Sequence, residues 1–315
     1  MTKVAVVIPC YRVQKHICGV ISSIGDEVQS IYVIDDACPE GSGDFVRDNV
    51  LDDRVTVVWH EENAGVGGAV LTGYAKALSE GADIVVKIDG DGQMDPSLIN
   101  EFVAPIARGE ADYTKGNRFY DLEKVSAMPK LRLFGNAVLS FMTKFSSGYW
   151  NIFDPTNGYT AIHKDLITHL PFSKISKRYF FETDMLFRLN TLRAVVVDIP
   201  MDARYEDEVS NLKISDIVGE FLRKHLRNFF KRIFYNYYLR DMSIASIELP
   251  VGILMIMFGI FYGVANWTVN SGVGVETSAG TVMLAALPII IGLQLILAFL
   301  SFDMSSTPRR IVHRR

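Results

Sequence analysis

Two aspartates, Asp89 and Asp91, have the residue type and the spacing that phosphate chemistry requires. They follow an apolar, β-branched segment, and an Asp-x-Asp turn after a buried strand presents its carboxylates at the edge of a sheet. A hard divalent cation can bridge such oxygens to a diphosphate. It offsets the charge on a departing nucleotide, which is the main electrostatic demand of sugar transfer from a nucleotide donor. An isolated Asp-x-Asp is often only a turn, so the prediction depends on the segments that surround it.

Those segments alternate between strand and helix patterns. The expected strands span 3–9, 30–35, 55–60 and 83–89, and the expected helices span 14–24, 43–51 and 66–79. This alternation predicts a parallel sheet with helices on both faces, where ligands bind beyond the carboxyl ends of the strands. Polar or turn-forming residues stand at each strand end: 9–11, Asp35 with Asp36, 63–69 and 89–93. Because four strand ends agree, we predict a nucleotide-binding α/β domain.

A glycine run at Gly65, Gly67 and Gly68 follows the third expected strand. A dinucleotide-binding fingerprint would follow the first strand and lead into the helix that binds the pyrophosphate. The sequence Pro9-Cys10-Tyr11 occupies that first turn instead, which argues against NAD binding. We expect the glycines to permit close packing of the following helix on the sheet rather than to contact a ligand.

Six motifs, taken together and in this order, resemble family 2 glycosyltransferases of the GT-A fold, and among them the dolichyl- or polyprenyl-phosphate sugar synthases. They are Val7–Tyr11, Ile34–Asp36, Asn63–Ala69, Asp89–Pro96, Gly116–Phe119 and Asp154–Tyr159. The resemblance covers residues 3–212, and two apolar C-terminal segments extend it to members with two membrane helices. It implies a GT-A, Rossmann-like head that binds a nucleotide sugar.

The resemblance also implies which residues bind the donor. Those that would line the base and ribose pocket are Pro9, Tyr11, Asp35 and Asp36. Those that would hold Mg²⁺ or Mn²⁺ with the donor diphosphate are Asp89, Asp91 and Gln93. Two departures leave open whether the donor is UDP-linked or GDP-linked. The usual Tyr-Asn-Glu is Tyr11-Arg12-Val13, and the usual Asp-Asp-x-Ser is Asp35-Asp36-Ala37-Cys38.

On the acceptor side, the resemblance implies two arginines and one acid. Arg118 would meet a phosphate of the donor or of the lipid, and Arg132 would contact the acceptor phosphate. Asp184 would lie near the transferred sugar, with Glu182 as the alternative. A lipid phosphate is already anionic near neutral pH, so it needs less help from a general base than an alcohol does. The catalytic residues would mainly position the two substrates and neutralise the leaving group.

Charge and hydropathy vary along the chain. Residues 1–212 hold 21 basic and 30 acidic residues, whereas 213–240 hold seven basic and two acidic residues. An acidic head argues against a nucleic-acid partner, and a basic collar favours an anionic surface. Apolar residues recur every three to four positions through 214–238, which predicts an amphipathic helix in the lipid headgroup layer or one packed on the head. Three cysteines without a paired pattern indicate a reducing compartment.

Two apolar segments follow the collar. Residues 249–275 carry no charge, and residues 281–302 are uncharged over about 33 Å of helix, which matches a bilayer core. Both outer flanks are basic, so we expect two transmembrane helices with the head and both termini in the cytosol. The short apolar run near the N-terminus does not suggest a signal peptide. The expected division is a head at 1–212, an interfacial helix at 213–243, a hairpin at 244–303 and a basic tail at 304–315.

The expected function is metal-dependent, inverting transfer of a sugar from a nucleotide donor to a polyprenyl phosphate, dolichyl or undecaprenyl, at the cytosolic membrane face. One alternative is a transferase that extends a lipid-linked saccharide at a hydroxyl, which would require a general base. Another is a catalytically inactive membrane scaffold. A processive polysaccharide synthase would carry Gln-x-x-Arg-Trp before its membrane helices, and this sequence lacks it. Hairpins of this kind often self-associate, so a homo-oligomer is also expected.

Overall fold

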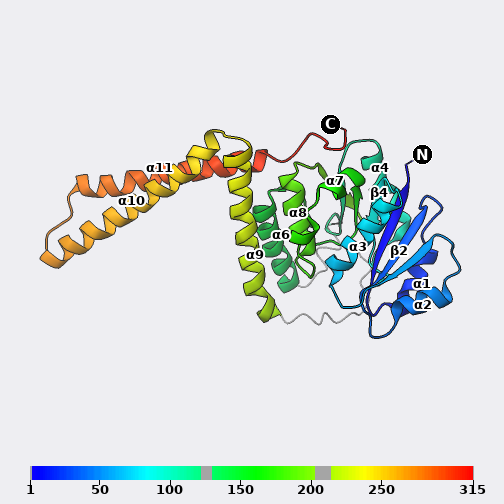
Figure 1. Ribbon diagram of the computed structural model, residues 1–315. Helices are drawn as coiled ribbons and strands as arrows, with labels where there is room; N and C mark the ends of the chain where they lie inside the picture. The colour runs from blue at the N-terminus through cyan, green and yellow to red at the C-terminus, as the bar shows by residue number, and fades with distance from the viewer. Residues whose placement is uncertain (1, 122–129, 203–213, 315) are drawn as a thin grey trace. The chain divides into compact units, whose positions relative to one another are not determined.

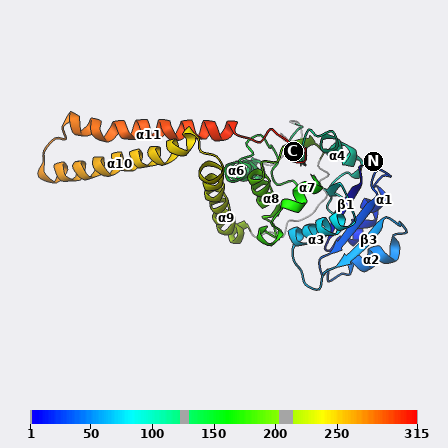
Figure 2. The ribbon, with the colours of Figure 1, turned by 45° about the horizontal axis from the view of Figure 1, so that its top comes forward.

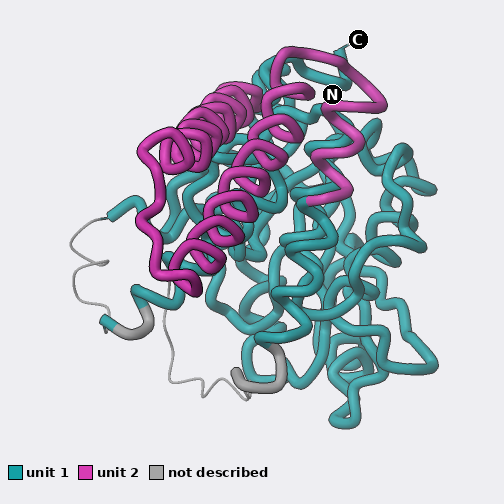
Figure 3. Tube along the Cα trace, turned by 90° about the vertical axis from the view of Figure 1, so that its left-hand side faces the viewer, with its two compact units in different colours: residues 1–229, 308–315 teal, residues 230–307 magenta. Residues whose placement is uncertain are grey.

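The computed structural model describes residues 2–121, 130–202 and 214–314, without the side chains of 131–132 and 214–217. The chain forms two compact units, one of residues 1–229 with 308–315 and one of residues 230–307 (Figure 3). These units differ from the expected division, because most of the amphipathic helix and the last eight residues belong to the head.

The described residues of the first unit form seven strands, and the first four lie close to the four expected ones. The strands are β1 (Val4–Cys10), β2 (Ser30–Asp35), β3 (Val55–Trp59), β4 (Ile84–Lys87), β5 (Tyr113–Asn117), β6 (Thr160–His163) and β7 (Val196–Pro200). The helices between them are α1 (Gln14–Ser22), α2 (Ser42–Asn49), α3 (Val66–Ser79), η1 (Pro96–Leu98), α4 (Ile99–Ala107), α6 (Lys130–Ser147), α7 (Lys164–His169), η2 (Phe172–Lys174) and α8 (Phe181–Thr191). The α/β alternation expected for the first half is confirmed.

The strands form one sheet in the order β3-β2-β1-β4-β6-β5-β7. Figures 1 and 2 show this sheet with helices beside it. The strands β1 to β4 are parallel, as expected, but β6 lies antiparallel between β4 and β5. The whole sheet is therefore mixed rather than parallel. The reversed direction brings the end of β6 beside the start of β4, where Lys164 N donates to Asp83 O and the chain continues directly into α7.

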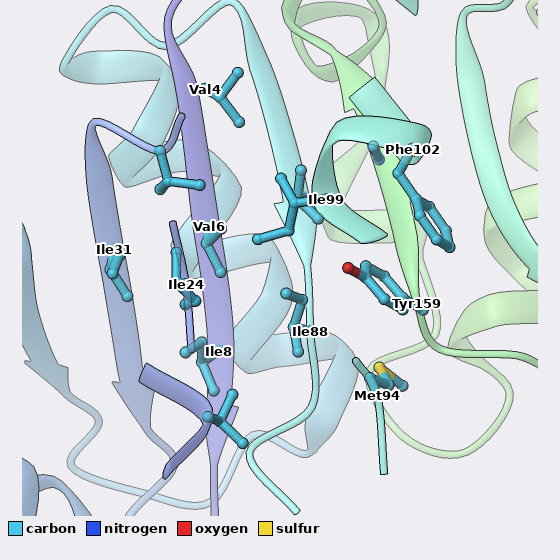
Figure 4. Close-up of a cluster of buried hydrophobic side chains, with 14 of the residues drawn as sticks. Val4, Val6, Ile8, Ile24, Ile31, Ile88, Met94, Ile99, Phe102 and Tyr159 are labelled. Carbon is cyan, nitrogen blue, oxygen red and sulfur yellow. The ribbon is translucent and has the colours of Figure 1, made fainter. Parts of the chain in front are cut away.

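Alternating strand residues build a core on each face of the sheet, as the period of two along a strand requires. On one face, Val4, Val6 and Ile8 of β1 pack with α1 and α4 (Figure 4). Phe102 of α4 stacks on Tyr159 there, with ring centroids 3.9 Å apart. On the other face, residues of β1 and β4 pack with α3, α7 and α8. The helices thus cover both faces and leave the strand ends to carry the site.

Helix α9 (Ile214–Phe234) contributes its first part to the head unit. Its inner face packs on α6 and α8: Phe229 stacks on Phe145, and the ring of His225 binds Ser146 Oγ at 2.8 Å. The inner face of this helix therefore packs on the head, which is the alternative that the sequence left open beside an interfacial helix. Three apolar residues at four-residue spacing, Val218, Leu222 and Leu226, remain exposed.

The second unit contains the end of α9, a π-helical turn η3 (Tyr235–Arg240), and two long helices, α10 (Ile244–Val273) and α11 (Ala279–Ser305). Helices α10 and α11 each contain an 18-residue segment, of mean hydropathy 2.2 and 2.5 respectively, and are long and apolar enough to cross a membrane. Gly252 and Gly292 lie where the helices pack together, because a Cβ on Gly252 would stand 2.8 Å from Gly292 O. Arg232 forms a buried ion pair with Asp303 of α11, and Tyr237 donates to the same carboxylate at 2.6 Å.

Residues 308–315 pack on the head at Asp112, which directly precedes β5. The buried Asp112 carboxylate accepts the backbone N–H groups of Val195 at 2.8 Å, Val312 at 2.9 Å and His313 at 3.1 Å. The His313 ring lies 2.7 Å from the same carboxylate and stacks on His163. This segment was expected to be only a basic tail, but it forms a docked part of the head.

Candidate active site

The candidate site begins at the carboxyl end of β4. Lys87 ends the strand and Asp89 follows two residues later, and the Lys87 Nζ lies 2.8 Å from Asp89 Oδ1. The same ammonium lies 3.5 Å from Glu182 Oε1, on the first turn of α8. The Lys87 side chain is 2 % exposed, whereas Asp89 is 28 % and Glu182 is 15 % exposed. The buried Lys87 ammonium therefore lies between two partly exposed carboxylates.

The turn after Asp89 is built for close approach. Gly92 has φ +81°, which an L-residue rarely adopts, and Asp91 Oδ1 accepts the backbone N–H of Gln93 at 3.0 Å. Gly158 lies against Asp89, because a Cβ there would stand 2.7 Å from Asp89 Oδ2. The glycine of the Asp154–Tyr159 motif thus leaves room for the Asp89 carboxylate.

The oxygen donors of Asp89, Asp91 and Gln93 suit a hard divalent cation. Among the described residues, no three His, Cys, Asp or Glu side chains form a ready-made metal cluster. A cation held by few protein ligands and completed by substrate phosphate oxygens fits this donor set, as is usual for Mg²⁺.

A row of polar residues crosses the sheet beneath this turn. Lys87 pairs with Thr160, Thr160 with Lys115, and Lys115 with Asp198 in neighbouring strands, so their side chains share one face. Burial lowers the pKa of Lys115 to about 8 and raises the pKa of Asp198 to about 6. Burial also opposes the charge of Lys87, but Asp89 and Glu182 overcome it and raise the pKa of Lys87 above its usual value. Of the two lysines, Lys87 is therefore the one whose positive charge the neighbouring carboxylates stabilise more strongly.

Arg118 directly follows β5 and is held by Asp154 in a two-point ion pair. Arg118 Nε lies 2.7 Å from Asp154 Oδ2, and its Nη2 lies 3.1 Å from Oδ1. Asp154 is fully buried and begins the motif that also contains Gly158. Such a planar pair fixes the orientation of the guanidinium. The two motifs that contain Arg118 and Asp154 are thus one structural unit.

Glu182 and Asp184 point in different directions, because residues two apart on a helix do not share a face. Glu182 faces Lys87, whereas the Asp184 carboxylate is buried and accepts from Ser176 N and from Asn228 of α9, both at 2.9 Å. Of the two acids that the sequence proposed near the transferred sugar, the structure therefore places Glu182 beside Lys87 and Asp89, and Asp184 against Ser176 and Asn228.

Asp35 and Asp36 are both buried, and both carboxylates bind backbone N–H groups. Asp35 accepts from Gly43 N at 2.6 Å, at the start of α2. Asp36 accepts from Ala64 N at 2.8 Å and from Gly65 N at 2.7 Å. These contacts shape the loops of the expected base and ribose pocket.

The remaining expected residues occupy varied positions. Pro9 is buried in β1, and Tyr11 is exposed just beyond it, with the Arg12 guanidinium 5.5 Å from its ring centroid. Arg132 lies on α6, but its side chain is outside the described residues. Gly67 N donates to Lys177 O at 2.8 Å, and a Cβ on Gly65 would collide with the same carbonyl. The glycine run is closely packed, but its neighbours lie in the loop before α8 and at the start of α8, so the expected packing against the sheet is wrong.

Sequence reasoning missed Lys87 and Lys115. Lys87 lies within the segment 83–89 that was interpreted only as a strand, and no element was predicted around Lys115. The available signal was a lysine inside an otherwise apolar strand, two residues before Asp89, because residues i and i+2 of a strand share a face.

Comparison with known proteins places this chain in a family. Residues 5–170 match glycosyl transferase family 2. An undecaprenyl-phosphate mannosyltransferase of Micrococcus luteus is 30% identical over 223 residues, covering 69% of this chain and 90% of the relative. A UDP-N-acetylglucosamine–dolichyl-phosphate N-acetylglucosaminyltransferase of Methanococcus voltae is 28% identical over 215 residues, covering 64% of this chain and 85% of the relative.

The fold also matches solved structures. Glucosyl-3-phosphoglycerate synthase of Mycobacterium tuberculosis, in complex with Mn²⁺, UDP and glucosyl-3-phosphoglycerate, superposes with a TM-score of 0.53 at 21% identity. The match covers 73% of this chain and 80% of that one. The mixed sheet, with its strand-end carboxylates, is therefore of the GT-A type, and the two C-terminal helices are candidate membrane spans. The chain is a glycosyltransferase that belongs to glycosyl transferase family 2.

Proposed function

We propose that this glycosyltransferase transfers a sugar from a UDP- or GDP-linked donor to a polyprenyl phosphate. The observation that carries the proposal is the placement of Asp89, Glu182 and Arg118 in the head of a chain that also has two membrane-length apolar helices. The names of the relatives from Micrococcus luteus and Methanococcus voltae support a polyprenyl-phosphate acceptor. Family membership argues against the inactive scaffold.

In this proposal, Asp89, Asp91 and Gln93 hold Mg²⁺ or Mn²⁺, which supplies positive charge to the donor diphosphate. Pro9, Tyr11 and the loops held by Asp35 and Asp36 form the base and ribose pocket. The Mycobacterium tuberculosis synthase, which shares this fold and was solved with Mn²⁺ and UDP, supports a metal ion and a nucleotide as ligands of the head.

Arg118, oriented by Asp154, binds a phosphate, and Arg132 contacts the acceptor phosphate. Glu182 takes the place near the transferred sugar that the sequence had assigned to Asp184, because only Glu182 faces Lys87 and Asp89. A single displacement by the acceptor phosphate oxygen breaks the bond from the sugar to the nucleotide diphosphate and inverts the anomeric carbon.

Two helices of the head, α9 and α6, carry exposed apolar residues, which supports activity at a membrane surface. The exposed residues Val218, Leu222 and Leu226 form an apolar stripe on α9, and α6 exposes Phe134, Val138 and Phe141 at similar helical spacing. The chain leaves the head unit after Phe229 and returns to it at Pro308, which supports a hairpin with both ends on one side. The basic flanks assign that side to the cytosol. Association of hairpins between copies is part of the same proposal.

The test incubates the full chain in detergent with Mn²⁺, polyprenyl phosphate and a panel of labelled UDP- and GDP-sugars. We expect label from one donor in a lipid product of inverted anomeric configuration, and loss of transfer on chelation and in Asp91→Ala. Asp165→Ala, at an exposed aspartate on α7, is the matched control. Absence of lipid-linked label with every donor would contradict the proposal.

Glu182 favours a second candidate function, because a partly exposed carboxylate beside the metal turn could act as a general base toward a hydroxyl. In that case the acceptor is a lipid-linked saccharide. Donor binding without transfer to polyprenyl phosphate, followed by transfer to a lipid-linked sugar, would identify it.

A further inference from the structure

Lys87 is an unusual residue for its position. It is 2 % exposed at the end of a strand whose other residues, Ile84 to Val86, are apolar. An isolated buried ammonium is strongly disfavoured, so its burial requires compensating carboxylates. Those carboxylates come from two separate elements, since Asp89 follows β4 and Glu182 begins α8.

The two contacts are unequal. Lys87 Nζ lies 2.8 Å from Asp89 Oδ1, a full ion-pair contact, and 3.5 Å from Glu182 Oε1, a longer one. Asp89 is also a residue that the proposed function assigns to the cation. The Lys87 ammonium and a divalent cation therefore compete for the Asp89 carboxylate, while Glu182 can serve as a second partner for the ammonium.

Resting on the proposed function, we propose that Lys87 is a positioning residue that links occupancy of Asp89 to the placement of Glu182. Before a cation arrives, Lys87 neutralises Asp89 and keeps it from repelling Glu182. When a divalent cation binds Asp89, the Lys87 ammonium pairs with Glu182 instead and holds that carboxylate toward the sugar. The carboxylates thus never face each other without a counter-charge.

Two variants move cation binding in opposite directions. Lys87→Met removes the competing charge, so the full chain in detergent should bind Mn²⁺ alone about tenfold more tightly, because a neighbouring positive charge opposes the cation. Glu182→Gln leaves Asp89 as the only carboxylate for Lys87, and Mn²⁺ should bind about threefold more weakly. Binding is measured by the electron paramagnetic resonance signal of unbound Mn²⁺, with no substrate present.

Turnover provides the second readout. In Lys87→Met, kcat should fall by about a hundredfold with little change in the KM for the donor, because Glu182 loses its support. Lys87→Arg, which keeps the charge, should restore Mn²⁺ affinity to the wild-type value and recover part of kcat. Tighter metal binding together with slower turnover is a combination that a purely structural lysine would not produce.

Lys164→Met is the matched control, because Lys164 forms an ion pair of 2.7 Å with Asp83 at the opposite end of β4. Its Mn²⁺ affinity and kcat should remain those of the wild type. Unchanged Mn²⁺ affinity in Lys87→Met, or weaker binding with a lower melting temperature, would overturn the proposal. Since Mn²⁺ binding needs no acceptor, this result is independent of whether polyprenyl phosphate is the substrate.

Discussion

Asp112 holds residues 308–315 on the head, and its replacement should release them. Its buried carboxylate receives N–H groups from Val195, Val312 and His313, and the His313 ring lies 2.7 Å away. We consider Asp112→Asn, which preserves the shape, removes the charge and turns one acceptor oxygen into a donor. That donor must then face an N–H group.

The size of the effect follows from these contacts. Hydrogen bonds to a charged group contribute about 1.5–3 kcal/mol and neutral ones about 0.5–1.5 kcal/mol, so each bond loses roughly 1 kcal/mol. The tail donors of Val312 and His313 can recover partners in water once the segment leaves, whereas Val195 N stays with the head. We therefore expect a loss of about 2–4 kcal/mol, or a melting temperature lower by about 5–10 °C for a head of this size.

The assay combines thermal unfolding with trypsin cleavage at Arg309 and Arg310, followed by mass spectrometry of the full chain in detergent. Cleavage should become about thirtyfold faster or more in Asp112→Asn, because a loss of 2 kcal/mol or more raises the released population by that factor. In a chain lacking residues 308–315, the same substitution should cost under about 1 kcal/mol, since the shared contacts are already gone. Wild-type cleavage rates and a melting temperature within about 2 °C of wild type would refute the reasoning.

Three further predictions concern the other contacts of the chain. Burial lowers the pKa of His225 from 6.5 to about 4, so the folded state favours the neutral ring. The stability that neutral His225 contributes is therefore complete above pH 6.5 and lost as the pH falls toward 4. In His225→Phe, up to roughly 3 kcal/mol of this pH dependence of stability should disappear, as measured by melting temperatures over that pH range. Asp154→Asn should lower kcat/KM for transfer by about a hundredfold, because Arg118 loses its two-point partner, and transfer at the wild-type rate would contradict that role. Gly252→Val should destabilise the helix pair by about 1–3 kcal/mol in detergent unfolding, because its side chain meets Gly292 O, and unchanged unfolding would show that the pair does not pack there.

Local sequence patterns were sufficient for the first half of the fold. Alternating β-branched segments and helical spacing located β1 to β4 and α1 to α3 close to their observed bounds. The same patterns identified α9 as amphipathic and α10 and α11 as long apolar helices, since these properties depend on residues a few positions apart. The antiparallel insertion of β6 was not predictable in this way, because strand order depends on contacts between distant segments.

The candidate site shows the same division. Asp89, Asp91 and Arg118 were found from motifs, but motif spacing did not distinguish Glu182 from Asp184. The distinction arises because α8 directs one acid toward Lys87 and the other toward α9. Asp35 and Asp36 likewise looked like ligand residues, and only the folded chain shows their carboxylates engaged with backbone N–H groups.

The sequence by itself determined which chemistry this chain can perform and that it can enter a membrane, because carboxylate spacing, glycine turns and runs of apolar residues act locally. The tertiary structure alone decided which polar side chains meet: Lys87 with Glu182, Arg118 with Asp154, and Asp112 with His313. Each of these pairs joins residues more than thirty positions apart. Their energies depend on distance and burial, and neither quantity exists before the chain has folded.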